Sequence, residues 1–251
     1  MATLVPAQRF GLRPELGAIK PGAHGDLVAW GDGFKPELVL VGGRRPEASV
    51  ERFPEWALDS VRLAPVPENV FQRPGRGRWR AMRINPEQPM VTREVESDGS
   101  DALLAVAVDR LGNRRAFRGL LEGFGLRSSS VATSAGSDSV SIVVVGGSAA
   151  DMRLAMDEVV RMRGGVAVVR GGEVLARWAA PVGGGFSEAP CEQVARDVEA
   201  CDRAMQADGC PLPYPVLTLE FLTSPAIPFL RISPDGYARL RDGARLGLEW
   251  D

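Results

Sequence analysis

The stretch Ser141-Ile-Val-Val-Val-Gly-Gly-Ser148 decides the fold class of this chain. Its four consecutive apolar residues, Ile142–Val145, are typical of a strand that is buried on both faces. Two glycines end the strand, and Ser148 stands three residues before Asp151, a spacing that favours a capped helix N-terminus. A strand that leads through a tight turn into a helix indicates an α/β unit. The helix is expected to continue to Gly164-Gly165 because apolar residues recur at helical spacing: Met152, Ala155, Met156, Val159 and Val160.

The sequence on both sides extends this unit with further strands. Downstream, Val166–Val169 predicts a second strand, and Glu173–Trp178 predicts a third after the turn at Gly171-Gly172. Upstream, Ala102–Val108 and Ala116–Leu121 are compatible with two partner strands. We therefore expect the chain from about residue 81 to form a compact α/β domain.

A second helix is expected from about Ser187, as its N-cap, to Asp208, with Gly209 after its end. The three cysteines of the chain have no C-x-x-C spacing, so they suit neither a disulfide framework nor a metal knuckle. We interpret them as small core hydrophobes. The expected apolar face of the helix consists of Cys191, Val194, Ala195, Val198, Cys201 and Met205.

The N-terminal part predicts a different structure. Residues 1–60 contain two short strand candidates, Asp26–Trp30 and Glu37–Val41, among turn-forming residues. Two short strands do not form a stable domain alone, so we interpret this part as a segment of a composite β-sandwich. Residues 61–80, rich in proline and arginine, predict a solvated linker, and residues 81–251 the C-terminal domain. The predicted fold class is mixed α/β, a short N-terminal β segment followed by an α/β C-terminal domain.

Composition excludes several classes of function. The 251 residues carry 30 basic and 32 acidic side chains, a net charge of −2, which gives no electrostatic footprint for nucleic acid or an anionic membrane. The longest apolar runs are too short to span a bilayer. The N-terminus lacks the basic and apolar regions of a secretion signal, so we expect a cytoplasmic location. A single histidine, His24, excludes a polyhistidine metal centre in this chain acting alone.

The candidate pocket residues are Asp138, Ser139 and Glu188. Asp138 is the one acid in the hydroxyl-rich segment 128–141, where a carboxylate serves as a ligand or proton carrier, or as a local turn or cap. Glu188 ends the glycine-rich loop Gly183–Glu188, which either lies over a ligand or only leads into the helix. The only sequence features that support metal-free catalysis by Asp138 or Glu188 are a carboxylate and this loop.

Several segments together have a specific order and spacing: Gly17–Gly22, Glu37–Gly43, Gly119–Leu126, Pro181–Glu188 and Cys210-Pro-Leu-Pro213. That order resembles the bacterial adenine deaminases, manganese- or iron-dependent members of the amidohydrolase superfamily. The resemblance implies that the first two segments lie where the family's chain leaves its catalytic barrel for a small β domain, and that the others belong to its C-terminal domain. It also implies a hydrolase of purine metabolism, which converts adenine and water to hypoxanthine and ammonia.

The same resemblance implies where the chemistry resides. In the family, barrel histidines and an aspartate hold the metal, and the barrel precedes the segment that corresponds to Met1. We therefore expect this chain to be the C-terminal part, inactive alone, with no catalytic residue, metal or cofactor of its own. Its expected partners are a separate barrel chain, or further copies of itself, and a small purine.

The chain departs from the family at one motif. Where the family reads His-Asp-Ser-His-Asn, this chain has Ser137-Asp138-Ser139-Val140-Ser141, so Ser137 and Val140 replace two imidazoles. If those histidines help to close the active site, that role is lost here. The alternative hypothesis is therefore a stand-alone purine-binding or regulatory domain without catalysis, with its pocket near Asp138 and the Gly183–Glu188 loop.

Overall fold

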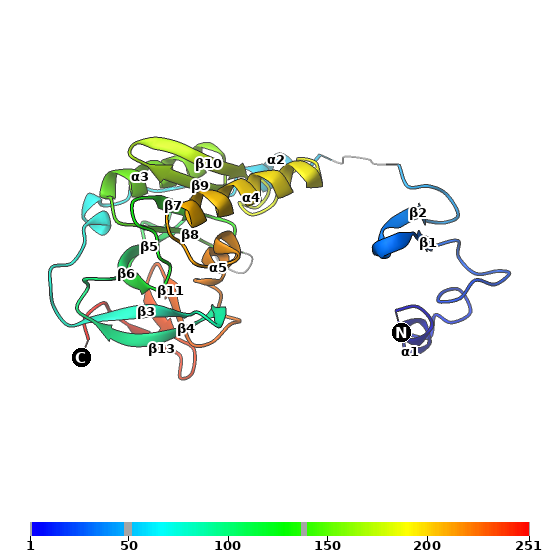
Figure 1. Cartoon of the computed structure of the whole chain (residues 1–251), viewed down its shortest axis with the longest axis horizontal. Helices are drawn as coiled ribbons and strands as arrows, with labels where there is room; N and C mark the ends of the chain where they lie inside the picture. The colour runs from blue at the N-terminus through cyan, green and yellow to red at the C-terminus, as the bar shows by residue number, and fades with distance from the viewer. Residues whose placement is uncertain (1, 48–51, 137–139, 251) are drawn as a thin grey trace. The chain divides into compact units, whose positions relative to one another are not determined.

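The structure is a computed structural model that describes residues 2–47, 52–136 and 140–250, and the chain divides into two compact units, Met1–Glu51 and Arg52–Asp251 (Figure 1). The smaller unit contains the two short strands predicted from the sequence, and they pair with each other in antiparallel orientation. It also contains a short helix, which the prediction of strands and turns missed. Pro6 lies in the first turn of this helix, where proline needs no hydrogen-bond partner. The elements of the smaller unit are α1 (Leu4–Arg9), β1 (Leu27–Trp30), a 3₁₀ turn (Asp32–Phe34) and β2 (Pro36–Leu40).

The larger unit is built on an eight-stranded sheet with the strand order β10-β9-β7-β8-β5-β6-β3-β4 (Figure 1). Strands β3 and β6 run parallel, and the other neighbouring strands of the sheet run antiparallel. A second, three-stranded antiparallel sheet follows near the end of the chain. The strands are β3 (Trp79–Asn85), β4 (Gln88–Ser97), β5 (Leu103–Asp109), β6 (Ala116–Glu122), β7 (Ser130–Thr133), β8 (Ser141–Gly146), β9 (Gly165–Arg170), β10 (Glu173–Ala179), β11 (Leu230–Ser233), β12 (Gly236–Arg239) and β13 (Ala244–Leu246).

Helices cover both faces of the large sheet because its central strands are apolar on both sides. Ile142 and Val144 of β8 pack in one core cluster with residues of α3, whereas Val143 and Val145 pack in the other with residues of α4 and α5. The mixed α/β fold predicted from the sequence is confirmed. The helices are α2 (Glu55–Leu58), α3 (Ala149–Arg161), α4 (Cys191–Ala207) and α5 (Pro215–Phe221), with a 3₁₀ turn at Glu68–Phe71.

The two predicted helix starts have different outcomes. Ser148 is the N-cap of α3, and its Oγ accepts a hydrogen bond from the backbone N–H of Asp151 at 3.3 Å. The prediction that Ser187 caps the second helix was wrong, because α4 begins at Cys191 with Pro190 at its N-cap. A residue before proline is disfavoured in helical conformation, and Ala189 precedes Pro190. The Oγ of Ser187 instead accepts a hydrogen bond from the N–H of Ala189.

The later start of α4 also corrects the interpretation of one cysteine. Cys191 is exposed because it is the first residue of the helix, so it is not a core residue. Cys201 and Cys210 are buried as predicted, and burial raises the pKa of their thiols to about 12 and about 11.

Residues 61–80, predicted as a solvated linker, pack in part on the larger unit. Val70 and Phe71 are buried in the core cluster that includes α3, and β3 begins at Trp79. Arginine holds this segment in place, because Nη1 of Arg118 donates to the carbonyls of Asn69 and Gln72, both at 3.0 Å. An arginine of the segment itself also contributes to packing, because Nη2 of Arg73 donates to the carbonyls of Gly99 and Ala102 at 2.7 and 2.6 Å.

Candidate functional site

A cleft of about 560 Å³ lies beside the start of α4 in the larger unit, and we call it the α4 cleft. A volume of this order suits a small-molecule site. The cleft is lined by the chain after β7, the glycine-rich loop before α4, the first turn of α4, and single residues of β10 and α5. The residues that line it include Arg110, Gly136, Trp178, Phe186, Val194 and Glu220.

Arg110 follows β5 and is 8% exposed. Its Nη1 donates to the carbonyl of Gly183 at 2.7 Å, which fixes the guanidinium against the glycine-rich loop. Its Nε is buried and has no hydrogen-bond partner among the described residues, and burial lowers its pKa. Gly184 permits this packing, since its φ is +73° and a Cβ there would collide with Nη1 of Arg110.

Trp178 provides a second buried donor. It lies in β10 opposite Val166 of β9 and is 8% exposed. Its indole Nε1 likewise has no hydrogen-bond partner in the described part of the chain. Most buried polar groups in proteins are paired, so two unpaired donors that line one cleft mark it as unusual.

Glu220 and Phe186 complete the chemistry of the α4 cleft. Burial, with a smaller contribution from the negative charge of Asp202, raises the pKa of Glu220 to about 7. Near pH 7 the Glu220 carboxyl is therefore protonated and neutral in a large fraction of the molecules. Phe186 pairs with Val182 at the end of the glycine-rich turn and is 67% exposed, so it offers an aromatic face to a ligand in the cleft.

The residues predicted from the sequence have mixed placements. Asp138 and Ser139, with Ser137 beside them, lie outside the described residues, although Gly136 lines the α4 cleft. Glu188 is half-buried, and its Oε1 accepts a hydrogen bond from the backbone N–H of Phe53 at 2.9 Å. That contact ties the start of the larger unit to the glycine-rich loop.

Sequence reasoning missed Arg110, Trp178 and Glu220. Arginines are frequent throughout this chain, so Arg110 has no distinctive neighbourhood in the sequence. Glu220 carries one usable signal, since it stands alone as an acid within the apolar run Val216–Leu222. The unpaired state of the two donors depends on tertiary packing, which no local pattern encodes.

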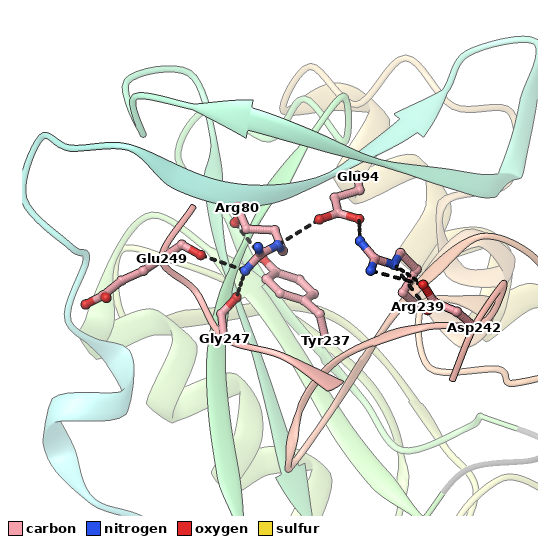
Figure 2. Close-up of polar contacts among 7 residues, drawn as sticks. All are labelled: Arg80, Glu94, Tyr237, Arg239, Asp242, Gly247 and Glu249. Carbon is pink, nitrogen blue, oxygen red and sulfur yellow. Dashed lines mark hydrogen bonds and ion pairs between the residues drawn. The ribbon is translucent and has the colours of Figure 1, made fainter. Parts of the chain in front are cut away.

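A second polar cluster, centred on Arg80, is shown in Figure 2. Nε of Arg80 donates to Glu94 at 2.8 Å, and its Nη1 donates to the carbonyls of Gly247 and Glu249 at 2.8 and 2.6 Å. Glu94 also pairs with Arg239 at 3.2 Å. These donors bind the chain itself, so the cluster attaches the C-terminal segment to the large sheet.

Tyr237 anchors the same region from below the sheet. Its hydroxyl accepts a hydrogen bond from the N–H of Leu120 at 2.6 Å. The same hydroxyl donates to the carbonyl oxygen of Arg80 at 3.2 Å (Figure 2). Burial raises the pKa of Tyr237. A Cβ at Gly119 would lie 2.5 Å from this hydroxyl, so glycine is needed there. We assign the cluster a structural role.

The described residues do not fit a catalytic metal ion. Within residues 2–47, 52–136 and 140–250, no group of three or more His, Cys, Asp or Glu side chains is arranged to hold one. In the same ranges, no helix has the length and apolar character needed to cross a bilayer.

A large, mainly antiparallel sheet with helices on both faces defines the larger unit as a three-layer α/β domain. Residues 81–243 match the family described as the adenine deaminase C-terminal domain, and the chain belongs to this family. The resemblance inferred from the sequence is thereby confirmed.

Individual relatives agree with this assignment. Adenine deaminase of Methylobacterium nodulans is 34% identical over 94% of this chain and 45% of its own length. Those of Desulforamulus reducens and Archaeoglobus fulgidus are 30% and 33% identical, each over 94% of this chain, and over 45% and 43% of their own lengths. The chain thus spans about half the length of the curated relatives it matches.

Proposed function

We propose that this chain acts as the C-terminal part of an adenine deaminase, which hydrolyses adenine to hypoxanthine and ammonia together with a metal-binding barrel. The observation that carries the proposal is the match of 94% of the chain to adenine deaminases over 45% of their length. The barrel belongs to residues other than these 251, on the same polypeptide or on a separate chain.

In this proposal the metal is the family's manganese or iron, which supplies an activated water when it is bound. The described residues do not fit the metal, so no step of the reaction is assigned to them. The chain contributes the α/β domain beside the barrel. We also propose a cytoplasmic location, where a reducing environment keeps thiols such as those of Cys201 and Cys210 free.

Reconstitution tests the proposal. The chain is co-expressed with the part of the Methylobacterium nodulans enzyme that lies outside the matched stretch, and hypoxanthine formation from adenine is measured with manganese present. We expect the two parts to copurify and to form hypoxanthine, whereas the chain alone forms none. Hypoxanthine formation by the chain alone would overturn the proposal, as would two folded parts that neither copurify nor react.

A second function, purine binding or regulation without catalysis, is favoured by one observation. By the resemblance inferred from the sequence, Ser137 and Val140 stand where the family has two histidines, so this chain lacks two imidazoles at these positions. Isothermal titration of the chain with adenine and with hypoxanthine distinguishes the two functions. Tight binding of either purine by the chain alone supports the second function, and its absence supports the first.

A further inference from the structure

Two residues that line the α4 cleft each carry a buried side-chain donor for which the described chain provides no acceptor. These donors are Nε of Arg110 and Nε1 of Trp178, and both residues are 8% exposed. An unpaired buried donor costs folding free energy, so a site that keeps two of them gains stability when a ligand provides acceptors. The ligand is therefore expected to carry hydrogen-bond acceptors.

The charge in the α4 cleft selects among acceptors. Arg110 forms no ion pair with any described residue, and burial lowers its pKa, so no described carboxylate pairs with its desolvated positive charge. A buried charge without a partner is strongly unfavourable, and an anionic ligand would relieve it. Burial raises the pKa of Glu220 to about 7, so near neutral pH its carboxyl is partly neutral and opposes an anion less than a fully ionised carboxylate would.

The apolar residues that line the α4 cleft indicate what the non-polar part of the ligand is. Phe186 is 67% exposed and lines the cleft, and the side chains of Val194 and Ala135 add apolar surface. An exposed phenyl ring packs favourably against another aromatic ring. The volume of about 560 Å³ is sufficient for a ligand of one or two rings.

We propose that the α4 cleft binds a small planar aromatic carboxylate, whose oxygens accept hydrogen bonds from Arg110 and Trp178 and whose ring packs against Phe186. A carboxylate has two oxygens with about four acceptor positions, enough for both donors. Guanidinium–carboxylate hydrogen bonds are among the strongest in proteins. This site goes beyond the proposed function, since it requires neither a barrel nor deamination.

Nuclear magnetic resonance of the indole N–H groups tests the site directly. The full chain is labelled with ¹⁵N, and the Trp178 indole signal is assigned by its disappearance in Trp178→Phe. Benzoate is the probe, its neutral isostere benzamide tests the charge, and inorganic phosphate tests the need for a ring. We expect benzoate to shift the Trp178 signal. The dissociation constant from this titration should be at least about tenfold lower than that of benzamide or of phosphate.

Variants test the two donors separately. Arg110→Gln is expected to remove the preference for benzoate over benzamide. The matched control Arg163→Gln removes an exposed charge that pairs with exposed Glu55, so it should bind benzoate as the wild type does. If Arg110→Gln does not fold, Trp178→Phe keeps an aromatic ring without the donor. Calorimetry should then show benzoate binding weakened by about fivefold or more.

Four results would overturn the proposed site. They are an unmoved Trp178 signal at about 10 mM benzoate, near the weak end of measurable affinity, equal binding of benzoate and benzamide, equal binding of phosphate, or unchanged binding in folded Arg110→Gln. None of them bears on the proposed function, whose readouts are copurification and hypoxanthine formation.

Discussion

Replacing Glu220 by glutamine is expected to stabilise the folded protein at alkaline pH and to change little at acidic pH. In the folded chain, burial and then the charge of Asp202 raise the pKa of Glu220 from 4.5 to about 7. The folded state therefore holds this proton more tightly than the unfolded state does. Stability should fall as the pH rises from about 4.5 to about 7 and then level off.

The magnitude follows from the same two pKa values. A rise from 4.5 to about 7 sets an upper limit of about 3 kcal/mol at about 1.4 kcal/mol per tenfold change in proton affinity. Because the side chain is only half-buried, solvent screening reduces the expected effect to about 1–2 kcal/mol. Glutamine keeps the shape of the protonated acid and cannot ionise.

Urea unfolding of the larger unit at about pH 5 and about pH 8 measures the effect. Between these two pH values, the free energy of unfolding of the wild type should fall by about 1–2 kcal/mol more than that of Glu220→Gln. Glu192→Gln, an exposed acid in α4, serves as the control and should behave as the wild type. An equal pH dependence in wild type and Glu220→Gln would show that the folded state does not hold the Glu220 proton more tightly than the unfolded state does.

Three further predictions concern stability. Tyr237→Phe should lower the free energy of unfolding by about 1–3 kcal/mol in urea titrations, since the buried N–H of Leu120 loses its acceptor; an unchanged value would contradict this role. Burial raises the pKa of Asp208, but hydrogen bonds led by that from Ser128 outweigh it and hold the pKa at about 2. Asp208 therefore contributes to the free energy of unfolding above about pH 4, and this contribution is lost as the pH falls towards about 2. In Asp208→Asn the free energy of unfolding should depend less on pH in this range. A pH dependence equal to that of the wild type would contradict this role. Gly184→Ala should lower the thermal midpoint, because the added methyl collides with the buried Arg110 guanidinium; a midpoint equal to the wild type would show that the loop moves freely.

The central elements of the fold follow from sequence alone because their signals are local. The apolar run Ile142–Val145, the cap at Ser148 and the glycines after α3 determine one strand and one helix within a continuous stretch. Where local signals compete, prediction fails. At the start of α4, Ser187 is a good capping residue, but the nearby Pro190 prevents a helix from beginning there.

The candidate site is less predictable because its features are tertiary. The sequence suggests the glycine-rich loop, and the structure places Phe186 of that loop at the α4 cleft. Arg110 follows β5 and Trp178 lies in β10, and it is the packing of the larger unit that places both residues along one cleft. Such juxtapositions depend on the register of β5, β9 and β10 rather than on residue type.

A chimera tests whether this chain is the C-terminal part of an adenine deaminase. These 251 residues replace the stretch they match in the Methylobacterium nodulans enzyme, and hypoxanthine formation from adenine is measured with manganese. We predict that the chimera forms hypoxanthine, and that Ser137→His together with Val140→His increases the rate. A folded, metal-loaded chimera that forms no hypoxanthine, with or without the two histidines, would contradict the account.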